Sequence, residues 1–243
     1  MSSAPDLTSR VLRHERLVIA GGLALLVALS WWFLAGGAGL ESHSGMAMAP
    51  PLAALVLMWW LMMVAMMLPS SAPAVLLYAR VRRARDGDGA VAGSWVFLGG
   101  YLGAWLLFSL AAAAAQTAIT GPSMVLDDAR LAAAVLIAAG LYQLSPFKSV
   151  CLRQCQSPAQ FLSRHWRPGA GGAVRLGVLH GAYCVGCCWM LMALLFVGGV
   201  MNLAWIVALT LMVGVERLVP RGEWIARAAG IALIAWGMIR LAS

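Results

Sequence analysis

Three cysteines lie within five positions of an apolar stretch, and a histidine precedes the first of them by four residues. These residues are His180, Cys184, Cys187 and Cys188. Because each helical residue turns by about 100°, all four side chains fall within a sector of roughly 100° on one face. Thiolates on one face select soft ions such as Cu(I), Zn(II) or iron–sulfur centres. The alternative is that the cysteines are small packing residues and that His180 is a buried donor with a partner.

A group of five methionines falls in the window 58–67. Met58, Met62 and Met66 share one helical face, Met63 lies at its edge, and Met67 points further round. Thioethers are neutral, cost little in lipid and bind Cu(I) far better than hard cations. The group therefore favours a soft monovalent ion, although methionine is also a routine filler of membrane helices.

Pro69 and Pro73 follow the methionines directly. Each proline lacks an N–H, so a carbonyl four residues earlier loses its helical partner and the helix should kink. We expect Ser70 and Ser71 to reach back to the freed backbone groups. A kinked helix lined by methionine suits a passage or a hinge, and it suits packing equally well.

Two smaller groups of soft ligands lie outside these apolar runs. His43, Met46 and Met48 fall in a small, flexible segment, where imidazole and thioether ligands could capture copper on an oxidising side. Cys151 and Cys155 are four residues apart in a basic segment. We expect the neighbouring positive charges of Lys148 and Arg153 to favour their thiolates, which would make the pair a hand-off site or a redox pair.

The composition is that of a multi-pass membrane protein. Of 243 residues, 62% are hydrophobic and 11% are charged, whereas a soluble domain is about half apolar and a quarter charged. The net charge of +8 comes from arginines and a lysine in short connecting segments, so it is a topology signal and nucleic acid is not an expected partner. Five cysteines, none in a segment predicted to lie outside, argue against a disulfide framework.

We predict an all-α membrane helix bundle with about seven transmembrane helices and a single transmembrane domain over residues 1–243. The first span has no evident cleavage site and is expected to be an uncleaved signal anchor. The predicted spans are 17–35, 53–78, 94–120, 129–147, 174–198, 201–216 and 223–241.

The basic residues predict a cytoplasmic N-terminus. With the tail 1–16 inside, 15 of the 17 basic residues lie on the cytoplasmic side, and only Arg130 and Arg240 remain outside. Segment 36–52 is then an outer loop, and 148–173 is the longest cytoplasmic loop. At the cytoplasmic end of the sixth span, Glu216 is expected to pair with Arg217 or Arg221 rather than to bind metal.

Glycine spacing indicates where helices can pack closely, and two missing patterns exclude some classes of transporter. Gly99 and Gly103, and likewise Gly177 and Gly181, are four residues apart and allow close helix packing. No internal repeat is evident in the sequence, so an inverted-repeat transporter is not supported. No phosphate-binding G-x-x-x-x-G-K-[ST] motif occurs either, so an ATP-driven pump is not expected.

Four stretches resemble a bacterial family of predicted metal-binding integral membrane proteins, formally a domain of unknown function with some members labelled copper chaperones. The stretches are "MWWLMMVAMMLPSSAP", "YQLSPFKSVCLRQCQSP", "GVLHGAYCVGCCWMLMALLFVGGVMNLAWI" and "ERLVP". The resemblance runs from about Leu52 to Gly237 and raises copper above zinc, but it implies no mechanism. The motif positions are Met62, Met63, Met66, Met67, Pro69, Cys151, Cys155, His180, Cys184, Cys187 and Cys188.

The leading hypothesis is a non-enzymatic copper-handling protein of the bacterial inner membrane. It would bind Cu(I) between the second and fifth spans and transport it or deliver it to a membrane or periplasmic protein. The thiols of Cys184, Cys187 and Cys188 would be the primary ligands. His180 and the methionines on one face, Met58, Met62 and Met66, would be further donors.

Two alternatives stay open. Cys184 and Cys187 form a C-x-x-C pair, and residues three apart on a helix are within disulfide range, so a thiol–disulfide relay across the membrane is one. The other is an accessory or structural subunit of a membrane complex, in which the sulfur residues only pack. In that case, changing the cysteines to serine would have almost no effect.

Overall fold

The chain is an all-helical bundle, as the sequence predicts. The computed structural model describes residues 4–36, 51–86, 89–120, 125–126 and 128–242, and within these ranges no β-strand occurs. The helices are α1 (Ala4–Ala35), α2 (Leu52–Asp86), α3 (Ala90–Ile119), α4 (Ala129–Leu144), α5 (Pro146–Gln156), α6 (Pro158–His165), α7 (Gly169–Ala193), α8 (Leu195–Gly198), α9 (Leu203–Leu218) and α10 (Gly222–Ala242).

Five of these helical stretches are long and apolar enough to cross a membrane. They are Arg13–Ala35, Leu52–Arg85, Ala90–Ile119, Gly169–Gly198 and Gly222–Ala242, and α4 with α5 would make a sixth as one bent span. The remaining expected span corresponds to α9, whose 16 residues rise about 24 Å. That length falls short of the roughly 30 Å hydrocarbon core, so helix length accounts for five or six of the seven expected spans.

The expected fourth span ends earlier than predicted because of a serine–proline step. Helix α4 stops at Leu144, and α5 begins at Pro146 with a bend of 63° between them. Proline cannot continue a helix, and Ser145 caps the new one by accepting a hydrogen bond from the Lys148 backbone N–H at 3.3 Å. The segment 148–173 therefore contains most of α5 and all of α6.

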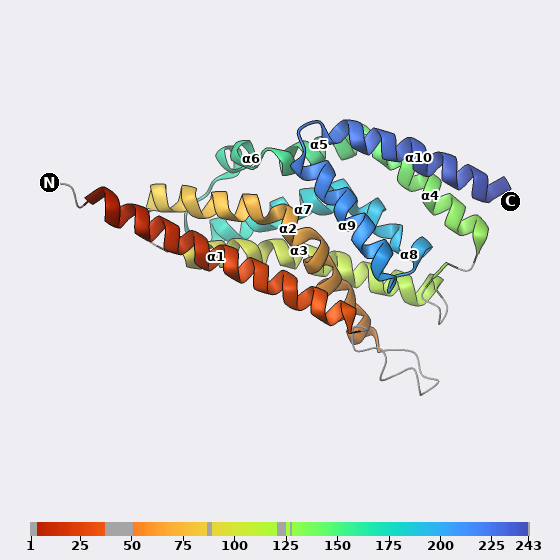
Figure 1. The fold of residues 1–243 in the computed structure, drawn as a ribbon, viewed down its shortest axis with the longest axis horizontal. Helices are drawn as coiled ribbons and strands as arrows, with labels where there is room; N and C mark the ends of the chain where they lie inside the picture. Colours follow the sequence, from red (N-terminus) through yellow and green to blue (C-terminus); the bar gives the residue numbers. More distant parts are fainter. Residues whose placement is uncertain (1–3, 37–50, 87–88, 121–124, 127, 243) are drawn as a thin grey trace.

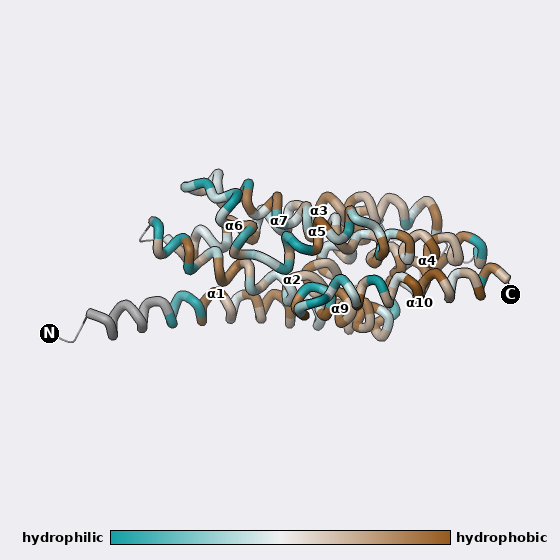
Figure 2. The backbone as a smooth tube through the Cα atoms, turned by 90° about the horizontal axis from the view of Figure 1, so that it is seen from above, coloured by the Kyte–Doolittle hydropathy of each residue, from teal (hydrophilic) through white to brown (hydrophobic). Residues whose placement is uncertain are grey.

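The long helices lie side by side, and the short ones cover one region of them. Helices α1, α2, α3 and α7 run along the long axis of the molecule, and α4 packs beside α10 (Figure 1). Helix α9 packs mainly against α2 and also touches α5, α7 and α10. Hydrophilic residues gather around α6 and at the end of the bundle where α2 is followed by α3 (Figure 2).

Glycines bring α3 and α7 close enough for their backbones to touch. A Cβ at Gly177 would collide with the Phe97 carbonyl, and one at Gly100 would collide with the Val174 carbonyl. Gly181 also faces α3, as the sequence predicts, but Gly99 and Gly103 face open space. The close face of α3 is therefore one residue away from the predicted glycine pair, and this crossing sets α3 directly against the cysteine-bearing helix.

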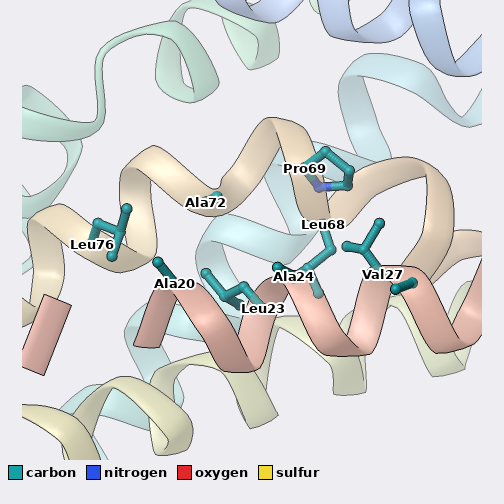
Figure 3. Close-up of a pocket in the computed structure, with 9 residues that line it drawn as sticks. Ala20, Leu23, Ala24, Val27, Leu68, Pro69, Ala72 and Leu76 are labelled. Carbon is teal, nitrogen blue, oxygen red and sulfur yellow. The ribbon is translucent and has the colours of Figure 1, made fainter. Parts of the chain in front are cut away.

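Helix α2 runs through both of its prolines and bends in its middle (Figure 1). The serines reach back, but not to the carbonyls of Ala65 and Pro69, which the prolines leave without a partner. Ser70 Oγ donates to the Met67 carbonyl and Ser71 Oγ donates to the Leu68 carbonyl, both at 3.0 Å. An apolar groove opens between α1 and α2 beside Pro69 (Figure 3). Its lining holds no sulfur residue, so the groove is separate from the thiols.

Candidate metal centre

The four side chains predicted to share a face of α7 are all buried. His180, Cys184, Cys187 and Cys188 are each no more than 2% exposed. All of them lie on the buried side of α7, and exposed apolar residues such as Val178 and Trp189 lie on its other side. The sector expected from the spacing is thus the sector that faces the bundle.

Contacts from α2 and α3 complete the surroundings of the thiols. The Cys188 Sγ lies 3.8 Å from the Met67 Sδ, and the Cys184 Sγ lies 3.0 Å from the Tyr101 hydroxyl. The same hydroxyl donates a longer bond, 3.4 Å, to the Met67 carbonyl. The contact between Met67 and Cys188 joins the second and fifth predicted spans, which the sequence alone could not establish.

The five clustered methionines are all buried in the same core. Met58, Met62, Met63, Met66 and Met67 are each 0–1% exposed. The Met67 Sδ lies against the Cys188 thiol, although the helical periodicity placed Met67 away from the predicted stripe. The methionines therefore supply a thioether to the thiols from a different helical position than the sequence pattern indicates.

All five cysteines gather where α5 meets α7. Helix α5 packs against α7, and the Cys155 thiol interacts with the Cys187 thiol. The Cys151 Sγ sits against Gly186, where an added Cβ would lie 2.9 Å from that sulfur. The sequence analysis treats Cys151 and Cys155 as a separate group, but the bend between α4 and α5 places them beside the α7 thiols.

The charges expected to act on Cys151 and Cys155 are instead paired with carboxylates. Lys148 Nζ donates to Glu216 Oε2 at 2.6 Å, and the Gln143 amide bonds to both of them. The expected pairing of Glu216 with Arg217 or Arg221 is therefore wrong. Successive helical residues point about 100° apart, so Glu216 faces α4 and α5 while its neighbour faces α7. Arg153 pairs with Glu223 at 2.9 Å.

Arg217 is a member of the site that the sequence did not reveal. Its Nη2 donates to the Cys184 carbonyl at 3.0 Å and lies 3.1 Å from the Cys187 Sγ and 3.3 Å from the Cys188 Sγ. In the sequence, Arg217 is one of the basic residues that predict a cytoplasmic segment, so its presence needed no binding site to explain it. The available signal was that it stands beside Glu216 at the end of an apolar run, where charge in lipid is costly.

The family model described as "PpoB2: Copper chaperone" matches residues 56–240. The chain belongs to this family. The matched range contains all five cysteines, the methionine group and Arg217, whereas His43, Met46 and Met48 fall before it and lie outside the residues that the structure describes. No curated protein and no solved structure matches the chain.

In this member of the copper-chaperone family, His180 lies among aromatic rings. Its ring centroid is 5.3 Å from that of Phe161, 5.7 Å from Tyr101 and 6.0 Å from Phe97. Its Nδ1 is buried and has no hydrogen-bond partner within the described part of the chain. A buried polar atom without a partner is rare, and here it is one turn from Cys184.

The described residues do not form a preorganised polydentate site of the usual kind. No three His, Cys, Asp or Glu side chains among them are arranged to hold one ion. The Cys187 and Cys188 thiols instead donate to the Cys184 carbonyl, at 3.2 and 3.0 Å. The sulfur donors are thus close together, although two of them are engaged in hydrogen bonds to a backbone carbonyl. Such a set suits an ion that needs few ligands and prefers thiolate and thioether, as Cu(I) does.

Proposed function

We propose that the protein binds Cu(I) among the α7 thiols and Met67 and delivers it to a protein partner, without catalytic turnover. The observation that carries the proposal is the contact of 3.8 Å between the Met67 Sδ and the Cys188 Sγ, in a fully buried setting. This contact brings the Met67 thioether to the Cys188 thiol, which lies one helical turn after the Cys184 thiol. Membership of the copper-chaperone family supports the same ion.

The donor chemistry separates Cu(I) from other metals. Hard cations take several oxygen ligands, usually with carboxylates among them, whereas the described thiol site offers sulfur atoms, one phenol and a cationic guanidinium. Zinc accepts thiolates but is almost always held by four ligands, whereas the gathered cysteines and the other His, Asp and Glu side chains of the described residues offer no three that are arranged to hold one ion. A thioether beside thiols is a combination suited to a soft, monovalent ion.

The proposed setting is the bacterial inner membrane, with about seven membrane segments and the N-terminus in the cytoplasm. The start of α1, the end of α2 and the start of α7 share one end of the molecule (Figure 1), and eight of the 17 basic residues lie on these segments. Cys151 and Cys155 are less buried than the α7 thiols and lie in the segment predicted to be cytoplasmic, so they are the proposed point where copper enters the protein. A membrane or periplasmic protein is the proposed recipient, and nucleic acid is not.

Metal loading of the purified protein tests this function. Protein in detergent is reduced, loaded anaerobically with Cu(I), desalted and analysed for metal by mass spectrometry. We expect about one bound copper per chain, and we expect its loss when Cys184, Cys187 and Cys188 are together changed to serine. Met238→Leu, at a position 55% exposed, is the control that should bind like wild type. An absence of bound copper in the wild-type protein would refute the proposal.

The packing of α5 against α7, which brings the Cys151 sulfur against Gly186 and the Cys155 thiol to the Cys187 thiol, favours one alternative, a thiol–disulfide relay. A thiolate of the pair would attack a partner's disulfide, and the second thiol would release the reduced partner, leaving a Cys155–Cys187 disulfide. Thiol trapping of the metal-free protein distinguishes the two functions. A relay shows a Cys155–Cys187 disulfide that forms and is reduced again with the partner's state, whereas a copper site loses thiol reactivity only when copper is added.

A further inference from the structure

The Arg217 guanidinium occupies the space between the thiols of α7 and the kinked part of α2. It is only 6% exposed. One terminal nitrogen, Nη2, contacts the Cys187 and Cys188 sulfurs, at 3.1 and 3.3 Å. The other, Nη1, donates to the Ser70 Oγ at 3.0 Å, so the group is held from both sides.

This positive charge has no carboxylate partner among the described residues. Their ion pairs use other groups, and the nearest acid in the chain, Glu216, is neutralised by Lys148 at 2.6 Å. Arg217 Nε is also buried and has no hydrogen-bond partner in the part of the chain that the structure describes. A guanidinium keeps its charge in proteins, and burying an unpaired charge is costly. The groups that can match this charge are the Cys187 and Cys188 sulfurs, which are negative as thiolates, the form that binds a metal.

A Cu(I) ion held by two thiolates is the species that would match it. Two thiolates and one monovalent cation carry a net charge of −1, which the guanidinium brings to zero. A divalent ion with the same two thiolates is neutral, so the guanidinium would leave the buried site at +1. Charge in a low-dielectric environment is unfavourable, so this balance favours the monovalent ion.

We propose that Arg217 is the residue that makes the site select monovalent over divalent cations. The inference rests on the proposed function, because it assumes that the α7 thiols bind the ion. Arg217 acts through its charge and is not itself a ligand. The alternative is that Arg217 only ties α9 to α7 and α2 through hydrogen bonds, in which case its removal would weaken the binding of every metal alike.

Affinities for two metals separate these roles. Cu(I) and Zn(II) dissociation constants are measured on reduced, detergent-purified protein by competition with a chromophoric chelator for each ion, and the ratio of the two constants is compared. Arg217→Gln keeps hydrogen-bond donors and removes the charge. We expect it to shift the ratio by about 100-fold toward Zn(II), the effect of a unit charge a few ångströms away. Arg217→Lys keeps the charge and should keep the ratio within about threefold of wild type.

Two further variants keep the test decisive. Arg227→Gln removes a charge from an exposed position on α10, and it should leave the ratio unchanged. Ser70→Asp places a carboxylate beside the Arg217 Nη1, where it neutralises the charge and should shift the ratio as Arg217→Gln does. It therefore provides the test if Arg217→Gln does not fold.

Each outcome bears on one of the two claims. A ratio that moves in Arg217→Gln and Ser70→Asp, and not in Arg217→Lys and Arg227→Gln, supports the assignment. A ratio unchanged in Arg217→Gln, with both affinities reduced equally or not at all, would overturn it and leave the copper function standing. Wild-type protein that binds no Cu(I) would overturn the proposed function itself.

Discussion

The buried ion pair between Lys148 and Glu216 is the most sharply testable feature of the region that holds the site together. Their side chains are 1% and 2% exposed, and Gln143 bonds to both. The pair joins the α4–α5 bend to the end of α9, and α5 carries the Cys155 that reaches Cys187. We predict that changing either partner alone to leucine destabilises the protein strongly, and that changing both does not.

The magnitude follows from the separation. Two unit charges 2.6 Å apart attract by about 6 kcal/mol at an effective dielectric constant of about 20. The cost of removing both charges from water offsets most of that attraction. A single replacement keeps that cost for the remaining charge and loses the attraction, so Lys148→Leu and Glu216→Leu should each lower the free energy of unfolding by about 3–5 kcal/mol. The double variant removes both charges and should lie within about 1–2 kcal/mol of wild type.

Equilibrium unfolding in mixed micelles, followed by tryptophan fluorescence, measures these differences as a double-mutant cycle. Arg153→Leu is the matched control, because its pair with Glu223 spans the same region and its side chain is 65% exposed. An exposed pair contributes about 0–1 kcal/mol, so this control should be nearly silent. Single variants that cost less than about 1 kcal/mol, or a double variant no better than the singles, would refute the reasoning.

Three further predictions concern the helices and sulfurs that form the site. Gly177→Ala should cost about 1–3 kcal/mol in the same unfolding assay, because its Cβ meets the Phe97 carbonyl, whereas Gly103→Ala has open space and should cost nothing. Met67→Leu should weaken Cu(I) binding about tenfold in chelator competition while unfolding within about 1.5 kcal/mol of wild type, since the two side chains have similar volume. Cu(I) at about 100 times its dissociation constant should stabilise the wild-type protein by about 2.7 kcal/mol, and a Cu(I) chelator should remove that gain.

Contrary results would identify which step of the argument fails. A destabilising Gly103→Ala would mean that the open side of α3 is packed by another subunit. Met67→Leu with unchanged copper affinity would remove the thioether from the site. Copper that binds without raising the stability of the folded state would place its ligands in segments that are equally available when the chain is unfolded.

Local features were predictable because they depend on a few neighbouring residues. The sector of α7 that carries Cys184, Cys187 and Cys188 follows from the 3.6-residue period, and that sector is buried. Ser70 and Ser71 do bond to carbonyls of the preceding turn, a local habit of serine in helices, but these carbonyls are not the ones that Pro69 and Pro73 leave without a partner. The end of α4 could have been read from Ser145-Pro146, a helix stop and cap that the hydrophobic run concealed.

Contacts between helices were not predictable in the same way. Gly100 rather than Gly99 faces α7, and Met67, which lies off the predicted stripe, reaches Cys188, because the rotation of a helix about its axis is set by all of its neighbours. A one-residue change in the contacting position turns the face by about 100°, which no single-helix pattern detects when almost every residue is apolar.

The sequence by itself determined that the chain is helical, that it has helices long and apolar enough to cross a membrane, and that its thiols and thioethers are of a kind that suits a soft ion. These properties depend on composition and on short-range periodicity. Only the tertiary structure decided that α5 folds back to add Cys155 to the α7 thiols, and that Arg217 meets those thiols while the adjacent Glu216 pairs with Lys148. The physical reason is that a buried charge takes whichever partner the packed helices bring within reach, and that partner can be distant in the chain.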